Sequence, residues 1–204
     1  MKRIDLRLLL GSLLLIGGIL LLLDTTEILP GAGQYFWAGL VAIAGAMFLF
    51  YYFTDRSKWW AAIPGFTLAG LAAAAMLPDR LGLEGLAFLS GIGLGFLAVF
   101  ASDRRQWWAL IPGGVLLTLA AISAMSEHYE IQETGGVFFV GLGLTFVLVA
   151  VLANMRWAYI PAGVLLIIGI LLGTPFVGVL EYIWIGLLLL GGLALIVSAL
   201  VQKS

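Results

Sequence analysis

The chain contains no cysteine, a single histidine and few charged residues, and each shortage excludes a class of protein. Without cysteine there can be no disulfide, thiolate metal site or iron–sulfur ligation. One histidine excludes a multi-histidine metal site and bis-histidine haem binding. Charged side chains make up 10% of the 204 residues, against about 25% in soluble domains. A water-facing surface cannot be built from this composition, so a soluble enzyme, a nucleic-acid binder and a disordered chain are excluded.

Long apolar runs dominate the sequence and predict an all-α integral membrane protein. Hydrophobic residues make up 63% of the chain. A helix needs about 20 apolar residues to cross a hydrocarbon core about 30 Å thick. Eight uncharged runs approach this length: 8–23, 35–53, 59–77, 85–101, 107–125, 135–153, 157–172 and 182–201. Because the connections are short, we expect antiparallel neighbouring helices in a single transmembrane domain that covers residues 1–204.

The charged residues predict the orientation, because their sign alternates between successive connections. Nine of the ten Lys and Arg residues lie in one set of segments: 1–7, 54–58, 102–106, 154–156 and 202–204. The other set holds eight acidic residues and a single base, Arg80. Basic residues in short loops remain in the cytoplasm. We therefore expect both termini to be cytoplasmic in a bacterial inner membrane, with the first run kept as an uncleaved anchor.

A tryptophan–proline motif recurs along the chain and predicts an internal repeat. Its copies are WWAAIPG at 59–65, WWALIPG at 107–113 and WAYIPAG at 157–163, with a weaker copy at 8–12. Gly45, Gly93 and Gly141 follow the same spacing in the second helix of each unit. We predict four helical hairpins in the same orientation, with units of approximately 1–55, 56–103, 104–154 and 155–204. Such parallel repeats differ from the inverted halves of many secondary transporters.

Tryptophans open each strong copy of the motif: Trp59, Trp60, Trp107, Trp108 and Trp157. A tryptophan ring is apolar while its N–H stays hydrated, so the residue gathers at membrane–water interfaces. We interpret these five residues as interface anchors. A repeated collar that docks lipid headgroups or a partner protein is the functional alternative, because basic residues precede the tryptophans.

No charged residue lies inside the apolar runs, so neither a proton relay nor an intramembrane catalytic site is expected. We predict no catalytic residue, no cofactor and no metal ligand. The polar groups within the runs are hydroxyls, of which Thr67, Thr118 and Thr145 are the main candidates for a solute pathway. Threonine hydroxyls in membrane helices also bond the carbonyl four residues earlier or bridge to a neighbour, so packing is the simpler interpretation.

One stretch of the chain resembles a known family. The segment LLLIGGILLLLD at 13–24, followed by LPG at 29–31, resembles the helix-then-turn opening of LiaI/LiaF-like transmembrane regions. Those regions occur in small bacterial membrane proteins of the cell-envelope stress type. The tryptophan–proline segments resemble tandem hairpins in bacterial polytopic membrane proteins of uncharacterised function. The resemblance implies a hairpin-built bacterial membrane protein, and it carries over no catalytic residue.

The leading functional hypothesis is a non-enzymatic membrane protein that folds as a compact bundle of four hairpins. It would serve as a scaffold, an accessory subunit or an envelope-stress partner. The expected partners are membrane lipids and another membrane protein or a second copy of the chain, and no nucleic acid. The alternative is a channel or carrier for a small neutral or weakly polar solute, lined by glycine backbone and the three threonines.

Overall fold

The computed structural model describes residues 6–128, 134–173, 185–186 and 188–192, and no strand occurs among them. The α-helices are α1 (Leu6–Thr25), α2 (Ala32–Thr54), α3 (Ala62–Met76), α4 (Glu84–Ser102), α5 (Leu110–His128), α6 (Gly135–Leu152) and α7 (Tyr159–Leu172). Short 3₁₀ turns are η1 (Arg56–Ala61), η2 (Asp79–Leu81), η3 (Trp107–Ala109) and η4 (Arg156–Ala158). The all-α prediction is confirmed for this part of the chain. Each of the first seven apolar runs coincides with one of these helices.

Five helical stretches are long and apolar enough to cross a membrane: Ala32–Thr54, Ser57–Met76, Glu84–Ser102, Trp107–Ser126 and Gly135–Leu152. The apolar parts of α1 and α7 are shorter, at Gly11–Thr25 and Arg156–Leu172. The eighth predicted run, 182–201, lies outside the described residues except for helical residues 185–186 and 188–192. The chain is therefore compatible with a membrane protein of at least five spans, and the count of eight remains a prediction.

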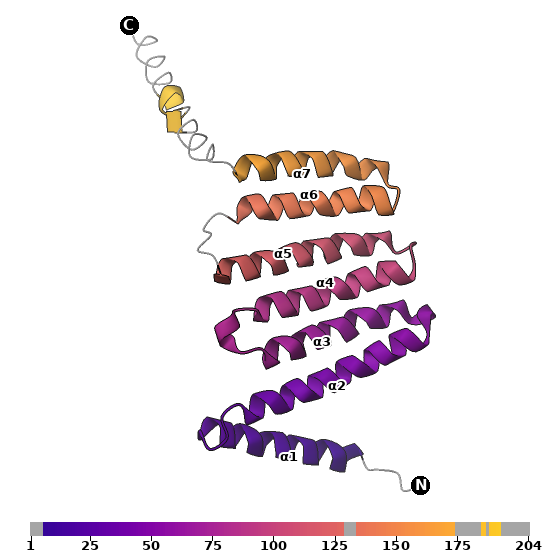
Figure 1. Cartoon of the computed structure of the whole chain (residues 1–204), viewed down its shortest axis with the longest axis vertical. Coiled ribbons are helices and arrows are strands. Elements are labelled where there is room, and N and C mark those ends of the chain that lie inside the picture. Colours follow the sequence, from indigo (N-terminus) through magenta and orange to yellow (C-terminus); the bar gives the residue numbers. More distant parts are fainter. Residues whose placement is uncertain (1–5, 129–133, 174–184, 187, 193–204) are drawn as a thin grey trace, which may run out of the picture.

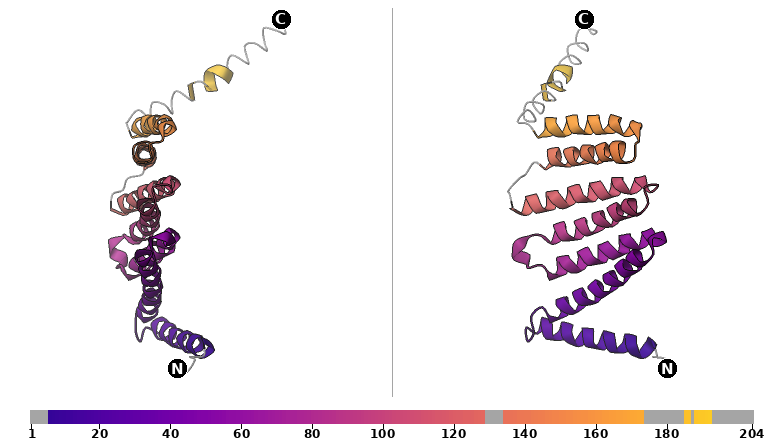
Figure 2. Two further views of the ribbon diagram at one scale, coloured as in Figure 1. Left: turned by 90° about the vertical axis from the view of Figure 1, so that its right-hand side faces the viewer. Right: turned by 45° about the vertical axis from the view of Figure 1, so that its right-hand side comes forward.

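The described helices form a single row rather than the compact bundle expected from the sequence. Each helix from α1 to α7 packs against its sequence neighbours, and the connections alternate between the two long edges of the row, where the helices end (Figure 1). The edge-on view on the left of Figure 2, which looks roughly along the helices, shows that the row is one helix deep over most of its length. Within the described residues, α1 and α7 each have a neighbouring helix on one side only.

Glycines two residues apart explain why α4 is one member of a row. Successive helical residues turn by about 100°, so residues two apart point to nearly opposite sides. A Cβ atom added at Gly91 would lie only 2.6 Å from the Cα of Gly70 in α3. A Cβ atom at Gly93 would instead lie 3.1 Å from the carbonyl oxygen of Gly113 in α5. Small residues on both sides let α4 approach two neighbours closely.

The same arrangement recurs in α6 and changes one expectation from the sequence. An added Cβ at Gly141 would contact Thr118 of the preceding helix α5, whereas one at Gly143 would contact Leu166 of the following helix α7. Gly45 and Gly93 face their following helices, α3 and α5. Gly143 rather than Gly141 therefore takes the corresponding place in α6.

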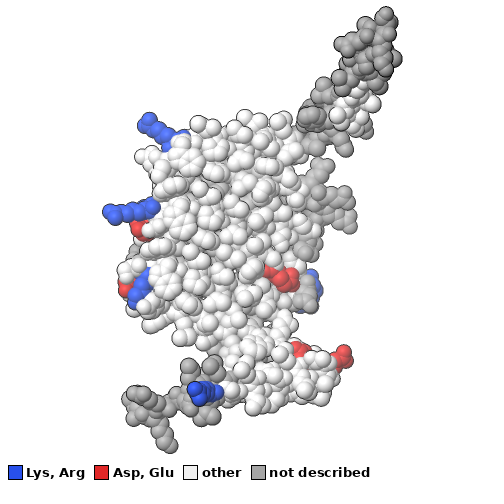
Figure 3. All heavy atoms as spheres, turned by 180° about the vertical axis from the view of Figure 1, so that it is seen from behind, with Lys and Arg blue, Asp and Glu red and all other residues white. Residues whose placement is uncertain are grey.

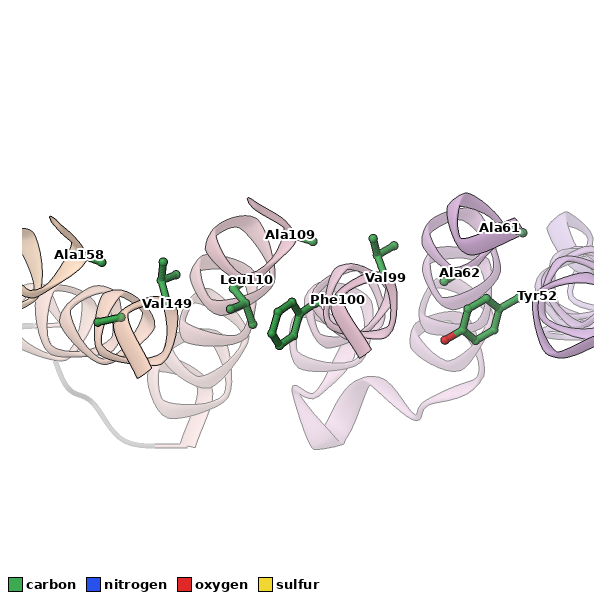
Figure 4. Close-up of a cluster of buried hydrophobic side chains, with 10 residues drawn as sticks. Tyr52, Ala61, Ala62, Val99, Phe100, Ala109, Leu110, Val149 and Ala158 are labelled. Atoms are coloured by element: carbon green, nitrogen blue, oxygen red, sulfur yellow. The ribbon is translucent and has the colours of Figure 1, made fainter. Parts of the chain in front are cut away.

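A buried hydrophobic cluster lies along one long edge of the row, where α2, α4 and α6 end and α3, α5 and α7 begin (Figure 4). It contains Tyr52, Ala61, Ala62, Val99, Phe100, Ala109, Leu110, Val149, Ala150 and Ala158. The Tyr52 hydroxyl lies 2.6 Å from the Ser102 hydroxyl and donates a 3.1 Å hydrogen bond to the Ala98 carbonyl oxygen. Tyr52 thus links α2 directly to α4 across the start of α3.

The hairpin of α1 and α2 is splayed, unlike the hairpin of α3 and α4 (Figures 1 and 2). The two helices meet near their connecting turn, where an added Cβ at Gly17 would lie 2.9 Å from the ring of Trp37. The turn is closed by the Asp24 carboxylate, which accepts a 2.7 Å hydrogen bond from the Gly31 N–H. Away from the turn the helices diverge, and the far half of α2 is left exposed towards α1.

Candidate functional site

The three 3₁₀ turns that carry the tryptophans end in the same way. The alanine that ends each turn is completely buried: Ala61, Ala109 and Ala158. The tryptophan just before it is partly exposed, at 49% for Trp60, 39% for Trp108 and 47% for Trp157. Trp59 and Trp107, one position earlier, are half-buried. Each turn therefore exposes one indole ring at the edge of the row where Lys58, Arg104 and Arg156 lie, as an interface anchor requires.

Each exposed tryptophan packs edge-to-face on a phenylalanine of the preceding helix. The ring centroids are 6.3 Å apart for Phe48 and Trp60, 6.1 Å for Phe96 and Trp108, and 6.1 Å for Phe146 and Trp157. Their interplanar angles are 75°, 78° and 73°, the T-shaped geometry that aromatic rings prefer. Sequence reasoning missed these phenylalanines, although a phenylalanine 11 or 12 residues before each tryptophan was a visible signal.

The tryptophan turns are also connected to one another. Trp107 and Trp157 lie with their centroids 6.2 Å apart, so the turn before α5 contacts the turn before α7. The Trp108 indole N–H donates a 2.8 Å hydrogen bond to the Gln106 side chain. The contact between Trp107 and Trp157 joins the two turns into one aromatic surface at the edge of the row.

Charged residues near the tryptophan turns make local contacts. The Asp55 carboxylate accepts hydrogen bonds from the Ser57 backbone N–H at 3.0 Å and from its hydroxyl at 2.7 Å. These bonds, with that of the hydroxyl the stronger cause, hold the pKa of the Asp55 carboxyl below its ordinary value of 3.8. The Lys58 ammonium lies 3.5 Å from Asp55 and 3.6 Å from the centroid of the Tyr51 ring. The Arg104 guanidinium lies 4.5 Å from the Phe100 ring.

Among the described residues, the charged side chains lie along the two long edges of the row, with a broad uncharged surface between them (Figure 3). The edge that holds the tryptophan turns also carries basic residues: Lys58, Arg104, Arg105 and Arg156. Glu84 begins α4 at the opposite edge. This separation is the geometry that a membrane-crossing slab needs, because ionised groups are costly inside hydrocarbon.

The structure brings Thr118 and Thr145 together in a reciprocal crossing between α5 and α6. A Cβ atom added at Gly114 would collide with the Thr145 side chain, and one added at Gly141 would collide with Thr118. Each threonine hydroxyl donates a 2.9 Å hydrogen bond to its own helix, Thr118 to the Gly114 carbonyl and Thr145 to the Gly141 carbonyl. The two side chains therefore act as packing groups whose hydroxyls are already engaged.

Thr67 does not join this pair, because it lies half-buried on α3, which α4 separates from α5. A shallow groove of about 350 Å³ runs over the crossing and is lined mainly by apolar side chains, including Leu117, Leu144 and Leu148. The three threonines therefore do not line one common path in the described part of the chain. Among the same residues, no group of three His, Asp or Glu side chains could hold a metal ion.

No protein family, curated protein or solved structure matches this chain. The likeness of residues 13–31 to LiaI/LiaF-like regions therefore remains a prediction, and the function has to be argued from the geometry alone.

Proposed function

We propose that the chain is a non-enzymatic, multi-pass protein of a bacterial inner membrane that serves as a scaffold, an accessory subunit or an envelope-stress partner. One observation carries this proposal: the described helices form a row one helix deep. A row has two broad faces, whereas a compact bundle of the same helices would bury much of that surface.

Much of the surface of the row is apolar and exposed (Figure 3). Large side chains that are at least half exposed occur on α2, α6 and α7, including Phe50, Leu144, Ile160 and Ile167. Soluble proteins rarely expose large continuous apolar patches, and such surfaces mark contacts with membranes or other proteins. In a bilayer these faces would be covered by lipid or by the helices of a partner. A wide surface of this kind is suited to holding other membrane components side by side.

We further propose that the row consists of four hairpins in the same orientation, the units being approximately 1–55, 56–103, 104–154 and 155–204. The recurring phenylalanine–tryptophan pairs and buried alanines support equivalent turns before α3, α5 and α7. We place the edge that holds the tryptophan turns, and both termini, on the cytoplasmic side. The gathering of basic residues at that edge supports the orientation through the positive-inside rule.

The alternative is a channel or carrier for a small neutral or weakly polar solute. The groove over the Thr118–Thr145 crossing favours it, because hydroxyls and glycine backbone lie beneath apolar walls there. A one-layer row cannot surround a solute by itself, so this function would need several copies to close into a ring. The engaged hydroxyls of both threonines make the packing interpretation the better supported one.

The scaffold proposal is tested by photo-crosslinking in the host membrane followed by native mass spectrometry. A photoreactive amino acid at Leu144 or Ile160, on the exposed faces, is expected to capture one membrane protein at fixed stoichiometry. The same probe at Ala109, which is fully buried, is the matched control and should capture nothing. If the faces capture no protein and liposomes show solute flux that is lost in Thr118→Val and Thr145→Val, the transport alternative replaces the scaffold.

A further inference from the structure

The splayed hairpin leaves two apolar grooves on α2, one on each side of a ridge formed by Met47 and Tyr51. The first has a volume of about 390 Å³ and is completed by Ala44, Phe48 and Trp60. The second has a volume of about 460 Å³ and is completed by Ile43, Ala46 and Phe50. None of the α1 side chains that the structure describes lines either groove. The ridge itself is prominent, with Met47 68% exposed.

The grooves lie where a preceding helix would pack if α2 were packed like α4. Met47 and Tyr51 continue the stripe of α2 that begins with Gly33 and Trp37, and those two residues contact α1 near the turn. The corresponding positions of α4, 48 residues later, are Gly95 and Val99, both of which are buried. On α2 the stripe is bulky and uncovered, so something other than α1 must cover it in the membrane.

A cation marks one end of both grooves. The Lys58 ammonium lies 3.6 Å from the centroid of the Tyr51 ring, and Tyr51 lines both grooves. Trp60, the exposed interface tryptophan of this turn, forms a wall of the first groove. An ammonium has three N–H donors, so contact with Asp55 and the Tyr51 ring leaves a donor for a further acceptor. Apolar grooves that run to a cation at the membrane surface are complementary to an acyl chain with an anionic headgroup.

We propose that this surface binds one anionic phospholipid of the cytoplasmic leaflet. Its two acyl chains lie in the two grooves astride Met47 and Tyr51, and its phosphate accepts a hydrogen bond from Lys58. The inference rests on the proposed membrane orientation, and it adds a defined lipid site to the general contact with lipids. The bound lipid fills the opening of the splayed hairpin and completes the row at α2.

The test uses the full chain, purified in detergent and mixed with equal amounts of phosphatidylglycerol and phosphatidylcholine before native mass spectrometry. We expect one phosphatidylglycerol molecule to be retained per chain. Lys58→Gln should weaken its binding about fivefold, the effect of one basic residue near a membrane surface. Arg105→Gln, at the same edge of the row but outside the grooves, should leave binding unchanged.

A second pair of variants tests the grooves. Ala44→Phe fills the first groove and should abolish retention of either lipid, while Leu94→Phe, on an exposed position of α4, should not. A photoreactive acyl chain on phosphatidylglycerol, applied to the unaltered chain, should label residues 43–51. This labelling does not depend on any variant folding correctly.

Several results would overturn the lipid site: equal retention of both lipids, equal weakening by Lys58→Gln and Arg105→Gln, or labelling confined to α7. Capture of a second copy or another protein by a probe at Met47 would show that protein, not lipid, covers α2. The scaffold proposal is judged separately, by crosslinks at Leu144 and Ile160, so either proposal can fail without the other.

Discussion

The hairpin of α1 and α2 and the hairpin of α3 and α4 differ in packing more than in length or composition. Along α3 and α4, Gly70, Gly91 and Gly95 bring the two backbones together over several turns. Along α1 and α2, Gly17 and Gly33 do so only near the turn. Farther along, α2 carries methionine and tyrosine where α4 carries glycine and valine. Hydrophobicity alone therefore does not pair membrane helices, because lipid is as apolar as leucine; small residues along the whole contact are required.

The largest test of this comparison introduces bulk into the close pair. Gly91→Leu should lower the free energy of unfolding by about 3 kcal/mol, the upper end of typical overpacking costs. An added Cβ would already lie 2.6 Å from the Gly70 Cα, and backbone cannot move aside as a flexible side chain can. Gly39→Leu in α2 is the matched control, since nothing lies within 4 Å of its added Cβ. Equal losses in an unfolding titration would contradict the comparison.

A smaller effect concerns the turns, in which the first and later hairpins are alike. A double-mutant cycle of Phe96→Ala and Trp108→Ala should give a coupling energy of about 0.5–1.5 kcal/mol, as expected for an edge-to-face pair. The cycle on Phe48 and Trp60 should give the same value, because the geometry is the same. Phe48 with Trp108, which are not paired, should show no coupling. Unequal couplings would place the difference between hairpins in the turns rather than along α1 and α2.

A third experiment attempts to convert the open hairpin into a closed one. The double variant Met47→Gly and Tyr51→Val gives α2 the small residues of α4, so α1 should close onto α2. Because the chain has no cysteine, spin labels at Gly11→Cys and Phe50→Cys report this distance without background. Electron paramagnetic resonance should show a shift to shorter distances. Met47→Leu with Tyr51→Phe keeps the bulk and should leave the distribution unchanged; a shift there would argue against the packing explanation.

The smallest expected effect concerns the charged turn before α3. Ser57→Ala removes the hydroxyl that bonds Asp55 and should raise the pKa of the Asp55 carboxyl back towards 3.8. Because that pKa is depressed in the folded chain, its contribution to stability is present above pH 3.8 and is lost as the pH falls through the folded value. NMR titration of the carboxyl carbon measures the shift. Asp55→Asn should abolish this part of the pH dependence, and an unaltered pKa in Ser57→Ala would contradict the assignment.

Much of the local structure was predictable because hydropathy and capping act over short distances. The first seven apolar runs are helices, and the tryptophans before Pro64, Pro112 and Pro161 lie at partly exposed turns. The packing role considered for Thr118 and Thr145 also matches their bonds to carbonyls four residues earlier. Thr67 looked equivalent in the sequence, yet its helix α3 does not reach the crossing of α5 and α6. Nothing local in the sequence distinguishes which neighbour a helix face will meet.

The alignment of Gly141 with Gly45 and Gly93 was wrong for a related reason. The stretch from Pro112 to Phe146 is two residues longer than the stretch from Pro64 to Phe96, with separations of 34 and 32 residues. A change of register by two residues turns a helix position to the opposite side. Equal spacing in the sequence therefore paired glycines that face different helices.

The sequence by itself determined that the chain is helical, apolar and divided by charge into two kinds of connection, because composition and periodicity act residue by residue. Only the tertiary structure decided that the helices stand in a row, that α1 diverges from α2 and that Tyr52 bridges α2 to α4. Those features depend on which small residues face each other across an interface. That pairing joins positions distant in the sequence, and the row follows because the close contacts of α4 and α6 lie on two opposite sides.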